Sequence, residues 1–148
     1  MHRSDVGFLL LLFHQNNGAI RGRKRIQKLV FLLKKQSGIP FGFEFKPYFY
    51  GPYSEELADT IQLFTSIGLL KERVVALDSG LTQYSYTLTP EAKQLIKKSK
   101  IRAPRNFKKE VTALSKMGTN ELVRASKRII SDTSYLTQVN GPTRLTAT

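Results

Sequence analysis

The 148-residue sequence contains no cysteine and no tryptophan, and it has only two histidines, His2 and His14. The absence of cysteine excludes disulfides, thiolate metal sites and cysteine nucleophiles. Neither histidine has a matching set of ligand partners near it in the sequence, and His14 fits the end of a helix better than a metal site. We therefore expect no metal ion and no other cofactor. A chain without cysteine is also consistent with the reducing cytoplasm, where we expect this protein to reside.

The sequence also lacks an apolar run long enough for a membrane. The one candidate, VGFLLLLF at 6–13, has eight residues, whereas a membrane-spanning helix needs roughly 20. Asp5 precedes this run and HQNNGA follows it, which does not match an export signal with its cleavage site. The run therefore predicts a buried first helix over about 4–15 and no membrane partner.

Acidic residues are scarce relative to basic ones. The chain has 24 Lys and Arg against 11 Asp and Glu, a formal net charge of +13 and a pI near 10.2. Such an excess repels itself in the folded state, so it usually indicates a polyanionic partner. The alternative is a solvated basic surface that serves solubility, as in thermophilic proteins rich in Lys and Arg. We expect nucleic acid as the partner, with DNA favoured over RNA.

The charge is concentrated in two blocks. Residues 21–35 contain seven basic residues and no acid, and residues 91–128 contain twelve basic residues against three acids. Between them, residues 44–78 contain three basic residues and six acids. We expect the two basic blocks to form one continuous surface in the folded protein.

The pattern of helix and strand signals predicts a mostly helical α+β fold, a winged helix-turn-helix with a β-hairpin wing and additional C-terminal helices. Helices are expected over 4–15, 22–36, from a Ser54 cap to Gly68, and over 90–100 behind a Thr89 cap; the wing strands are 69–77 and 81–88. These elements form a predicted winged-helix-like domain, 1–100. A C-terminal helical extension, 101–132, contains amphipathic stretches at 105–117 and at 120–131, the second capped by Thr119. Residues 133–148 are expected to be a flexible tail.

The best candidates for phosphate contact lie at the start of the second predicted helix. They are Arg21, Arg23, Lys24, Arg25 and Lys28, where free backbone N–H groups and the helix dipole also attract anions. The alternative is that these side chains lie along the helix and cover apolar surface with their stems. A second group, Lys97, Lys98, Arg102 and Arg105, spans the end of the fourth predicted helix and the linker after it. A helix C-terminus by itself favours one or two lysines, but not this many cations.

An aromatic segment, FGFEFKPYFYGPY at 41–53, predicts an extended edge strand that ends in a Gly51–Pro52 turn. Its rings have two interpretations. They can pack into the core, or some of them can remain exposed and stack on unpaired bases, for which Tyr48, Tyr50 and Tyr53 are the candidates. The alternation along the segment allows only some of the rings to be buried together.

The start of the third predicted helix does not suit a conventional sequence-specific repressor. In an ordinary winged helix this end enters the major groove. Here it carries Glu55, Glu56 and Asp59, which phosphates would repel. No set of residues with the spacing of a catalytic or metal site is visible either, so we expect a binding protein and not an enzyme.

Two short motifs point to a family. Ile26-Gln27-Lys28-Leu29, followed by Tyr50-Gly51-Pro52, resembles the YwgA-like proteins of bacteria and archaea. The same pair is more distantly similar to the Panacea antitoxin-associated domain. The resemblance covers about residues 5–98 and implies a winged-helix-like fold, but it implies no activity and no catalytic residues.

The sequence thus predicts a non-catalytic nucleic-acid-binding protein that grips the phosphate backbone. The alternative is an antitoxin-like regulatory module whose basic surface binds an acidic protein partner. In either case the helical stretch 105–131 is a candidate homodimer contact. A nuclease or lyase activity is a third hypothesis, but no residue in the sequence is singled out for it.

Overall fold

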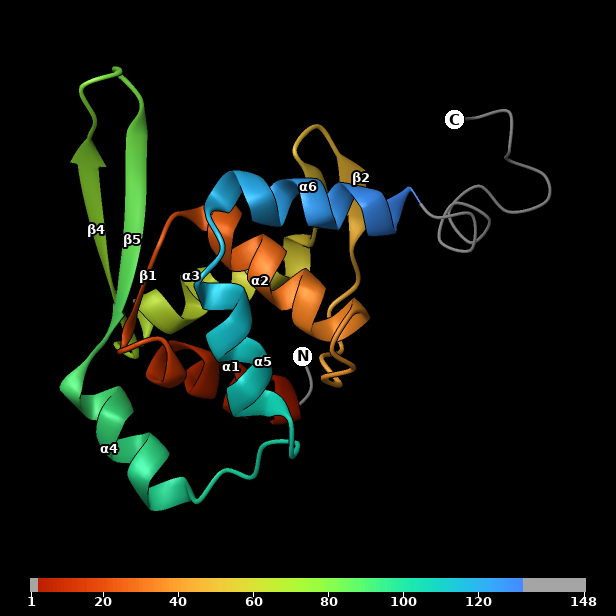
Figure 1. Cartoon of the computed structure of the whole chain (residues 1–148). Helices are drawn as coiled ribbons and strands as arrows, with labels where there is room; N and C mark the ends of the chain where they lie inside the picture. The colour runs from red at the N-terminus through yellow and green to blue at the C-terminus, as the bar shows by residue number, and fades with distance from the viewer. Residues whose placement is uncertain (1–2, 132–148) are drawn as a thin grey trace.

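The computed structural model describes residues 3–131, and within this range the chain forms an α+β fold. The helices are α1 (Arg3–Gln15), α2 (Arg23–Lys35), α3 (Glu55–Ser66), α4 (Pro90–Ser99), α5 (Phe107–Ser115) and α6 (Thr119–Ile130). The strands are β1 (Ala19–Arg21), β2 (Lys46–Tyr48), β3 (Gly51–Tyr53), β4 (Leu70–Ala76) and β5 (Thr82–Leu88). Figure 1 shows α1 and α2 surrounded by the other elements.

The predicted starts of the third and fourth helices are confirmed, because the predicted capping residues form their hydrogen bonds. The Ser54 hydroxyl accepts a hydrogen bond from the Leu57 N–H at 3.1 Å and caps α3. The Thr89 hydroxyl accepts from the Ala92 N–H at 3.1 Å and caps α4, with Pro90 in its first turn. His14 is exposed in the last turn of α1, as predicted.

A three-stranded antiparallel sheet has the order β1-β5-β4. The sequence did not predict β1, which is only three residues long and therefore too short for alternation to be visible. Gly18 and Gly22, both with positive φ, bound this strand, and Ile20 pairs with Tyr86 of β5. The sheet thereby joins the beginning of the chain to the predicted wing.

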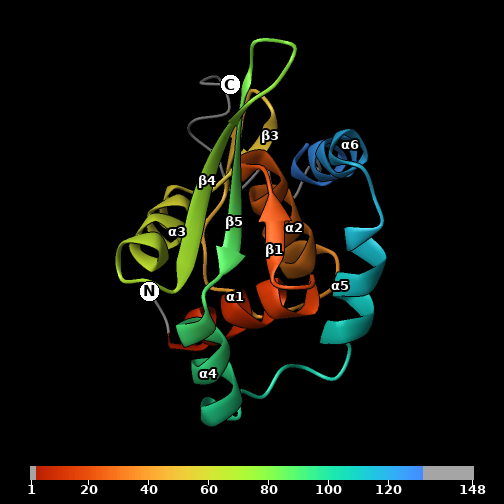
Figure 2. The same ribbon diagram turned by 90° about the vertical axis from the view of Figure 1, so that its left-hand side faces the viewer.

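The β4–β5 hairpin extends well beyond the helices (Figures 1 and 2). At its base Leu70, Tyr86 and Leu88 are buried in the core. Toward its tip the apolar residues are exposed; they are Val74, Val75, Leu77 and Leu81. The hairpin is therefore anchored at one end only.

The aromatic segment is not the single extended strand that was predicted. Phe41, Phe43 and Phe45 are buried in the core outside any strand, and the remainder folds into the β2–β3 hairpin. Gly51, with φ +96°, takes a conformation that favours glycine and lets the chain reverse after Tyr50. The hairpin places Pro47 opposite Pro52, so neither position needs an N–H for the ladder.

The C-terminal helices share the core of the preceding domain. The Phe107 ring of α5 lies 6.3 Å from the Phe8 ring of α1, and α6 packs on α2 and β3. Their apolar faces, with Val111, Leu114, Leu122, Ala125 and Ile130, are buried in the chain itself. The apolar stripes that suggested a dimer contact are thus already used within one molecule.

The predicted Thr119 cap is wrong. Gly118 is the N-cap residue of α6, and its N–H donates to the Glu121 carboxylate at 3.1 Å. Thr119 is instead the first helical residue. The Glu121 side chain, three residues beyond Gly118 and within the helix, accepts the hydrogen bond from the N–H of Gly118, so no capping by a Thr119 hydroxyl is needed. The predicted tail, 133–148, lies outside the described residues. None of the helices in residues 3–131 combines the length and the apolar character needed to cross a bilayer.

Candidate nucleic-acid interface

The five cations predicted at the start of α2 do not share one environment. Arg21 and Lys24 are exposed. Arg23, whose side chain is 59% exposed, and the partly buried Arg25 make side-chain contacts with other elements, and Lys28 is buried. The five cations therefore differ in how far their side chains are engaged in contacts within the protein, which sequence spacing cannot reveal.

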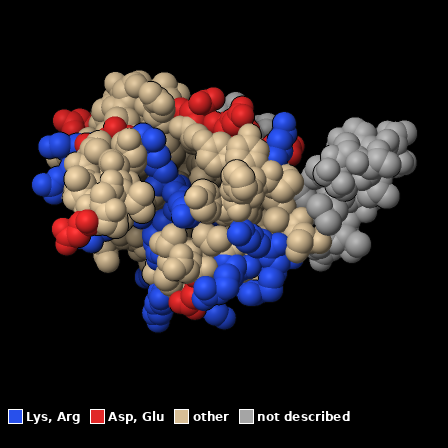
Figure 3. All heavy atoms as spheres, turned by 90° about the horizontal axis from the view of Figure 1, so that it is seen from above, with Lys and Arg blue, Asp and Glu red and all other residues tan. Residues whose placement is uncertain are grey.

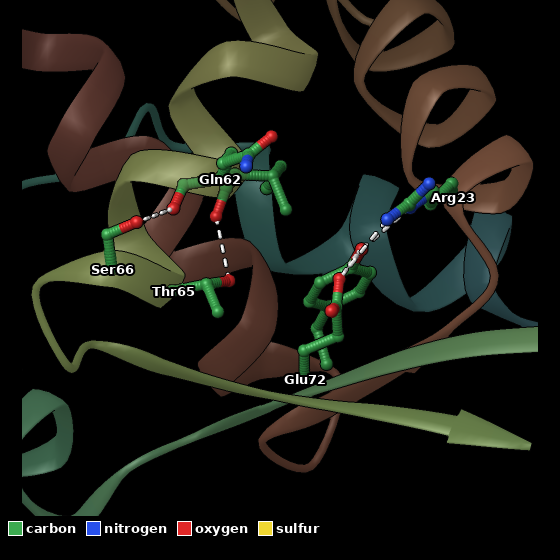
Figure 4. A network of polar contacts seen from close by, with 7 residues as sticks. Arg23, Gln62, Thr65, Ser66 and Glu72 are labelled. Atoms are coloured by element: carbon green, nitrogen blue, oxygen red, sulfur yellow. Dashed lines mark hydrogen bonds and ion pairs between the residues drawn. The ribbon is translucent and has the colours of Figure 1, made fainter.

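Arg23 belongs to a polar network at one wall of a cavity (Figure 4). Its Nε donates to the Tyr86 hydroxyl at 2.9 Å, and its Nη2 lies 3.3 Å from Glu72 Oε2. The Tyr86 hydroxyl donates to the same carboxylate at 2.7 Å, and the hydrogen bond that Arg23 donates to Tyr86 is the main cause that raises the pKa of Arg23. The cavity, about 380 Å³, is lined by residues of α2, α3, β4 and β5, including Arg23, Gln62, Thr65, Ser66 and Glu72.

Arg25 fastens α2 to the turn between α5 and α6. Its Nη2 donates to the Ser115 carbonyl at 2.9 Å and its Nη1 to the Thr119 hydroxyl at 3.3 Å. The guanidinium therefore bridges segments that are far apart in sequence. This contact gives Arg25 a role in packing the C-terminal helices.

Gln27 and Lys28 connect the Gln-Lys-Leu motif of α2 with the end of the Tyr-Gly-Pro motif and the segment that follows it. The Gln27 side chain donates to the Ser54 carbonyl at 2.9 Å and accepts from the Ser54 N–H at 2.8 Å. The Lys28 ammonium donates to the Pro52 carbonyl at 2.8 Å. Both side chains are buried, so α2 holds β3 and the start of α3 through their polar groups.

Lys28 lies among other cations. It is only 2% exposed, and its pKa is lowered to about 8, first by burial and then by the charges of Lys24 and Lys127. Lys127 comes from α6, and a Cβ on Gly51 would lie 3.4 Å from its Cγ and 3.6 Å from Lys28 Cε. We call Lys24, Lys28 and Lys127, gathered around Gly51, the α2–α6 basic cluster.

The surface seen from above carries a band of Lys and Arg across its middle and toward α6, with most Asp and Glu at the margins (Figure 3). An anion above the α2–α6 basic cluster would lower the mutual repulsion of its lysines. Charge counting along the sequence put Lys127 in the second basic block and did not place it beside α2, because no local signal indicates where α6 packs.

The second predicted group, Lys97, Lys98, Arg102 and Arg105, is exposed but lies elsewhere. α4 contacts α1 and β5, at the end of the molecule away from α6 (Figures 1 and 2). The structure therefore does not bring the two predicted groups together into one continuous surface. Lys127 of α6 is instead the cation that lies near the lysines at the start of α2.

Exposed rings adjoin the α2–α6 basic cluster at the tip of the β2–β3 hairpin. Tyr48 and Tyr50, both predicted stacking candidates, are 51% and 62% exposed, and Phe49, which was not predicted, is 94% exposed. The Lys24 ammonium lies 4.2 Å from the centre of the Tyr50 ring. The third candidate, Tyr53, is partly buried and stacks on Tyr48 with ring centres 5.1 Å apart.

The acidic start of α3 is exposed, with Glu55, Glu56 and Asp59 on its surface. The Tyr48 hydroxyl donates to Glu55 at 3.3 Å. In the part of the chain that the structure describes, no three His, Asp or Glu side chains are grouped as metal ligands. The lysines and exposed rings described above thus border the carboxylate of Glu55, which Tyr48 contacts.

Comparison with known proteins confirms the resemblance to the YwgA-like proteins. The chain is 40% identical to the uncharacterized protein YwgA of Bacillus subtilis (strain 168) over 80 residues. These aligned residues are 54% of this chain. The matched stretch spans about half, 47%, of that relative. No protein-family model matches the chain. No solved structure matches it either.

Proposed function

We propose that this YwgA-like chain is a non-catalytic nucleic-acid-binding protein that grips the phosphate backbone with Lys24 and Lys127, the exposed lysines of the α2–α6 basic cluster. The observation that carries the proposal is the convergence of Lys24, Lys28 and Lys127 from two helices that are distant in sequence. Burial and mutual repulsion of like charges are unfavourable without an anion, and a phosphate supplies one. The net charge of +13 supports the same class of partner.

A winged-helix assignment fits this function. The chain order α1-β1-α2-α3-β4-β5, with β5 between β1 and β4, supports such an assignment, as does the projecting β4–β5 hairpin. The β2–β3 hairpin would then be an insertion between α2 and α3. Because the start of α3 is acidic, we propose that α3 does not enter the groove and that the protein binds mainly to phosphates.

An acidic protein partner is the second candidate for the same face. The basic surface suits an acidic partner, and the exposed apolar residues of the β4–β5 hairpin, such as Leu77 and Leu81, favour contact with a protein. On this hypothesis the chain binds an acidic protein and is not retained by DNA or RNA. Binding measurements with nucleic-acid probes separate the two candidates.

The test measures binding of labelled duplex DNA, single-stranded DNA and RNA at several salt concentrations by fluorescence anisotropy. Lys24→Ala/Lys127→Ala removes two charges from the cluster, and Lys97→Ala/Lys98→Ala removes two from the opposite end as a matched control. We expect the first variant to weaken binding about tenfold or more. On duplex DNA its salt slope should fall by about 0.9 for each phosphate that the variant no longer neutralises. The control should change binding about twofold or less.

Equal effects of the two variants would mean that only net charge matters, and the proposed site would be wrong. Salt-independent binding would reject a grip on the phosphate backbone, and no binding at low salt would reject nucleic acid as the partner. Selective capture of an acidic protein, abolished in Lys24→Ala/Lys127→Ala, would then support the second candidate.

A further inference from the structure

The tip of the β2–β3 hairpin exposes three consecutive aromatic side chains. Among residues 3–131, Phe49 is the most exposed large apolar residue, at 94%. Its ring centre is 6.4 Å from that of Tyr50 at an interplanar angle of 51°, so Tyr50 leaves the faces of the Phe49 ring largely uncovered. Adjacent exposed rings with a polar rim are typical of a binding surface and not of scattered surface hydrophobics.

This tip is held in place from below. Lys28 binds the Pro52 carbonyl, Gln27 binds the backbone of Ser54, and α6 packs on Gly51. Each of these contacts lies within a few residues of Phe49. A ring displayed on an anchored hairpin loses less conformational entropy on binding than a ring on a loose loop.

The rings and the cations form one combined surface. The Lys24 ammonium lies over the Tyr50 ring, and Lys127 lies against Gly51, the next residue in the chain. Phosphates and base faces alternate along a single strand at short range, and a cationic groove with adjacent rings is the arrangement that binds such strands. The same cations would repel a second copy of this face, so the charge favours a polyanion over self-association.

We propose that Phe49, assisted by Tyr50 and Tyr48, stacks on unpaired bases, so that the chain prefers single-stranded nucleic acid or an unpaired segment of a duplex. The inference rests on the proposed function, because the α2–α6 basic cluster would hold the phosphates of the same strand. A fully paired duplex keeps its base faces stacked on one another and offers them to a protein ring only at its ends.

The first test compares Phe49→Ala with Leu81→Ala, a matched removal of an exposed apolar side chain at the tip of the other hairpin. The probes are a labelled oligodeoxythymidine, a duplex, and a spacer oligonucleotide with the same phosphates but no bases. Removal of one stacked base corresponds to a weakening of about 5- to 100-fold for Phe49→Ala on the single strand. The salt slope should not change, because Phe49→Ala leaves every lysine of the basic cluster in place.

The second test uses the absence of tryptophan from the sequence. Phe49→Trp introduces one indole at the hairpin tip, and stacking on a base should quench its fluorescence. The abasic probe should bind without quenching and about as weakly as the thymidine probe binds Phe49→Ala. A blue shift with phosphatidylserine vesicles and no response to the oligonucleotide would assign the tip to a membrane surface and overturn the inference.

Failures of the two proposals can be told apart. If Lys24→Ala/Lys127→Ala weakens binding but Phe49→Ala changes it less than about twofold, the basic cluster stands and the stacking inference falls. Concentration-dependent association that disappears in Phe49→Ala, without base-dependent binding, would also overturn it. If the wild-type chain binds none of the nucleic acids at low salt, the proposed function itself fails.

Discussion

The side-chain amide of Gln27 holds the backbone of Ser54 at both polar groups, donating to its carbonyl at 2.9 Å and accepting from its N–H at 2.8 Å. Ser54 in turn caps α3 with its hydroxyl. A residue in the middle of one helix therefore determines where the next helix begins. Since both residues are buried, no water is needed for this contact.

Replacing Gln27 with alanine should lower the free energy of unfolding by about 2–4 kcal/mol, because it leaves two buried backbone groups of Ser54 without partners. Urea titration followed by circular dichroism measures the change. Gln62→Ala, an exposed glutamine on α3, is the matched control and should change stability by less than about 0.5 kcal/mol. A decrease below about 1 kcal/mol for Gln27→Ala would mean that this contact does not hold the two helices together.

Gly51 and Gly80 allow backbone strain to be separated from packing. Both have positive φ, +96° and +88°, but a Cβ on Gly51 would meet Lys127 Cγ at 3.4 Å, whereas a Cβ on Gly80 meets nothing within 4 Å. Both alanine variants should be destabilised by a similar amount, about 1–2 kcal/mol from the left-handed conformation, because the contacts of a Cβ at Gly51 are at ordinary van der Waals distances. The comparison is made by thermal and urea unfolding. A clearly larger loss for Gly51→Ala would show that α6 packs more tightly on Gly51 than described.

The pKa of Lys28, lowered from 10.5 to about 8, makes stability depend on pH. Below about pH 8 this lysine is protonated in both the folded and the unfolded state, so its contribution is constant. Above it the folded state releases the proton first while the unfolded state keeps it until about 10.5, so the free energy of unfolding rises across this window. The difference between wild type and Lys28→Met should therefore shift in favour of wild type from about pH 7 to about pH 10. A difference that stays constant over this range would contradict the buried, charge-crowded position of Lys28.

Arg25 and Lys24 are neighbours in sequence but should respond differently to alanine. Arg25→Ala removes hydrogen bonds to Ser115 and Thr119 and should cost about 1–3 kcal/mol of stability. Lys24→Ala should stay within about 0.5 kcal/mol of wild type, because Lys24 is exposed. Both are measured by urea unfolding before any binding assay. If Arg25→Ala proves as stable as wild type, the contact between α2 and the α5–α6 turn is not significant.

Much of the fold followed from local sequence signals. Periodicity and caps at Ser54 and Thr89 located the helices, and alternation located the wing strands. β1 was missed because three residues carry no detectable period, and Pro47 led to the expectation of one edge strand where the chain folds into a hairpin. The predicted Thr119 cap was wrong because Gly118, with Glu121 three residues later, caps the helix in its place.

The site was predicted less well, because it depends on contacts between distant segments. Spacing placed Arg23, Lys24, Arg25 and Lys28 at one helix end, but it could not tell which of them are committed to Tyr86, Ser115 or Pro52. Nor could it bring Lys127 beside Lys24. Phe49 was not distinguished from the buried rings before it, because the alternation of the segment ends where the hairpin turns.

The packing of α6 onto α2 and β3 has a consequence for the newly synthesised chain. A ribosome makes Lys24 early and Lys127 near the end of the described range, so the lysine pair cannot assemble until α6 has emerged and docked. Incomplete chains would thus contain Lys24 and Lys28 without Lys127. On the proposed function, the complete phosphate site would form only once the last helix has docked, late in folding.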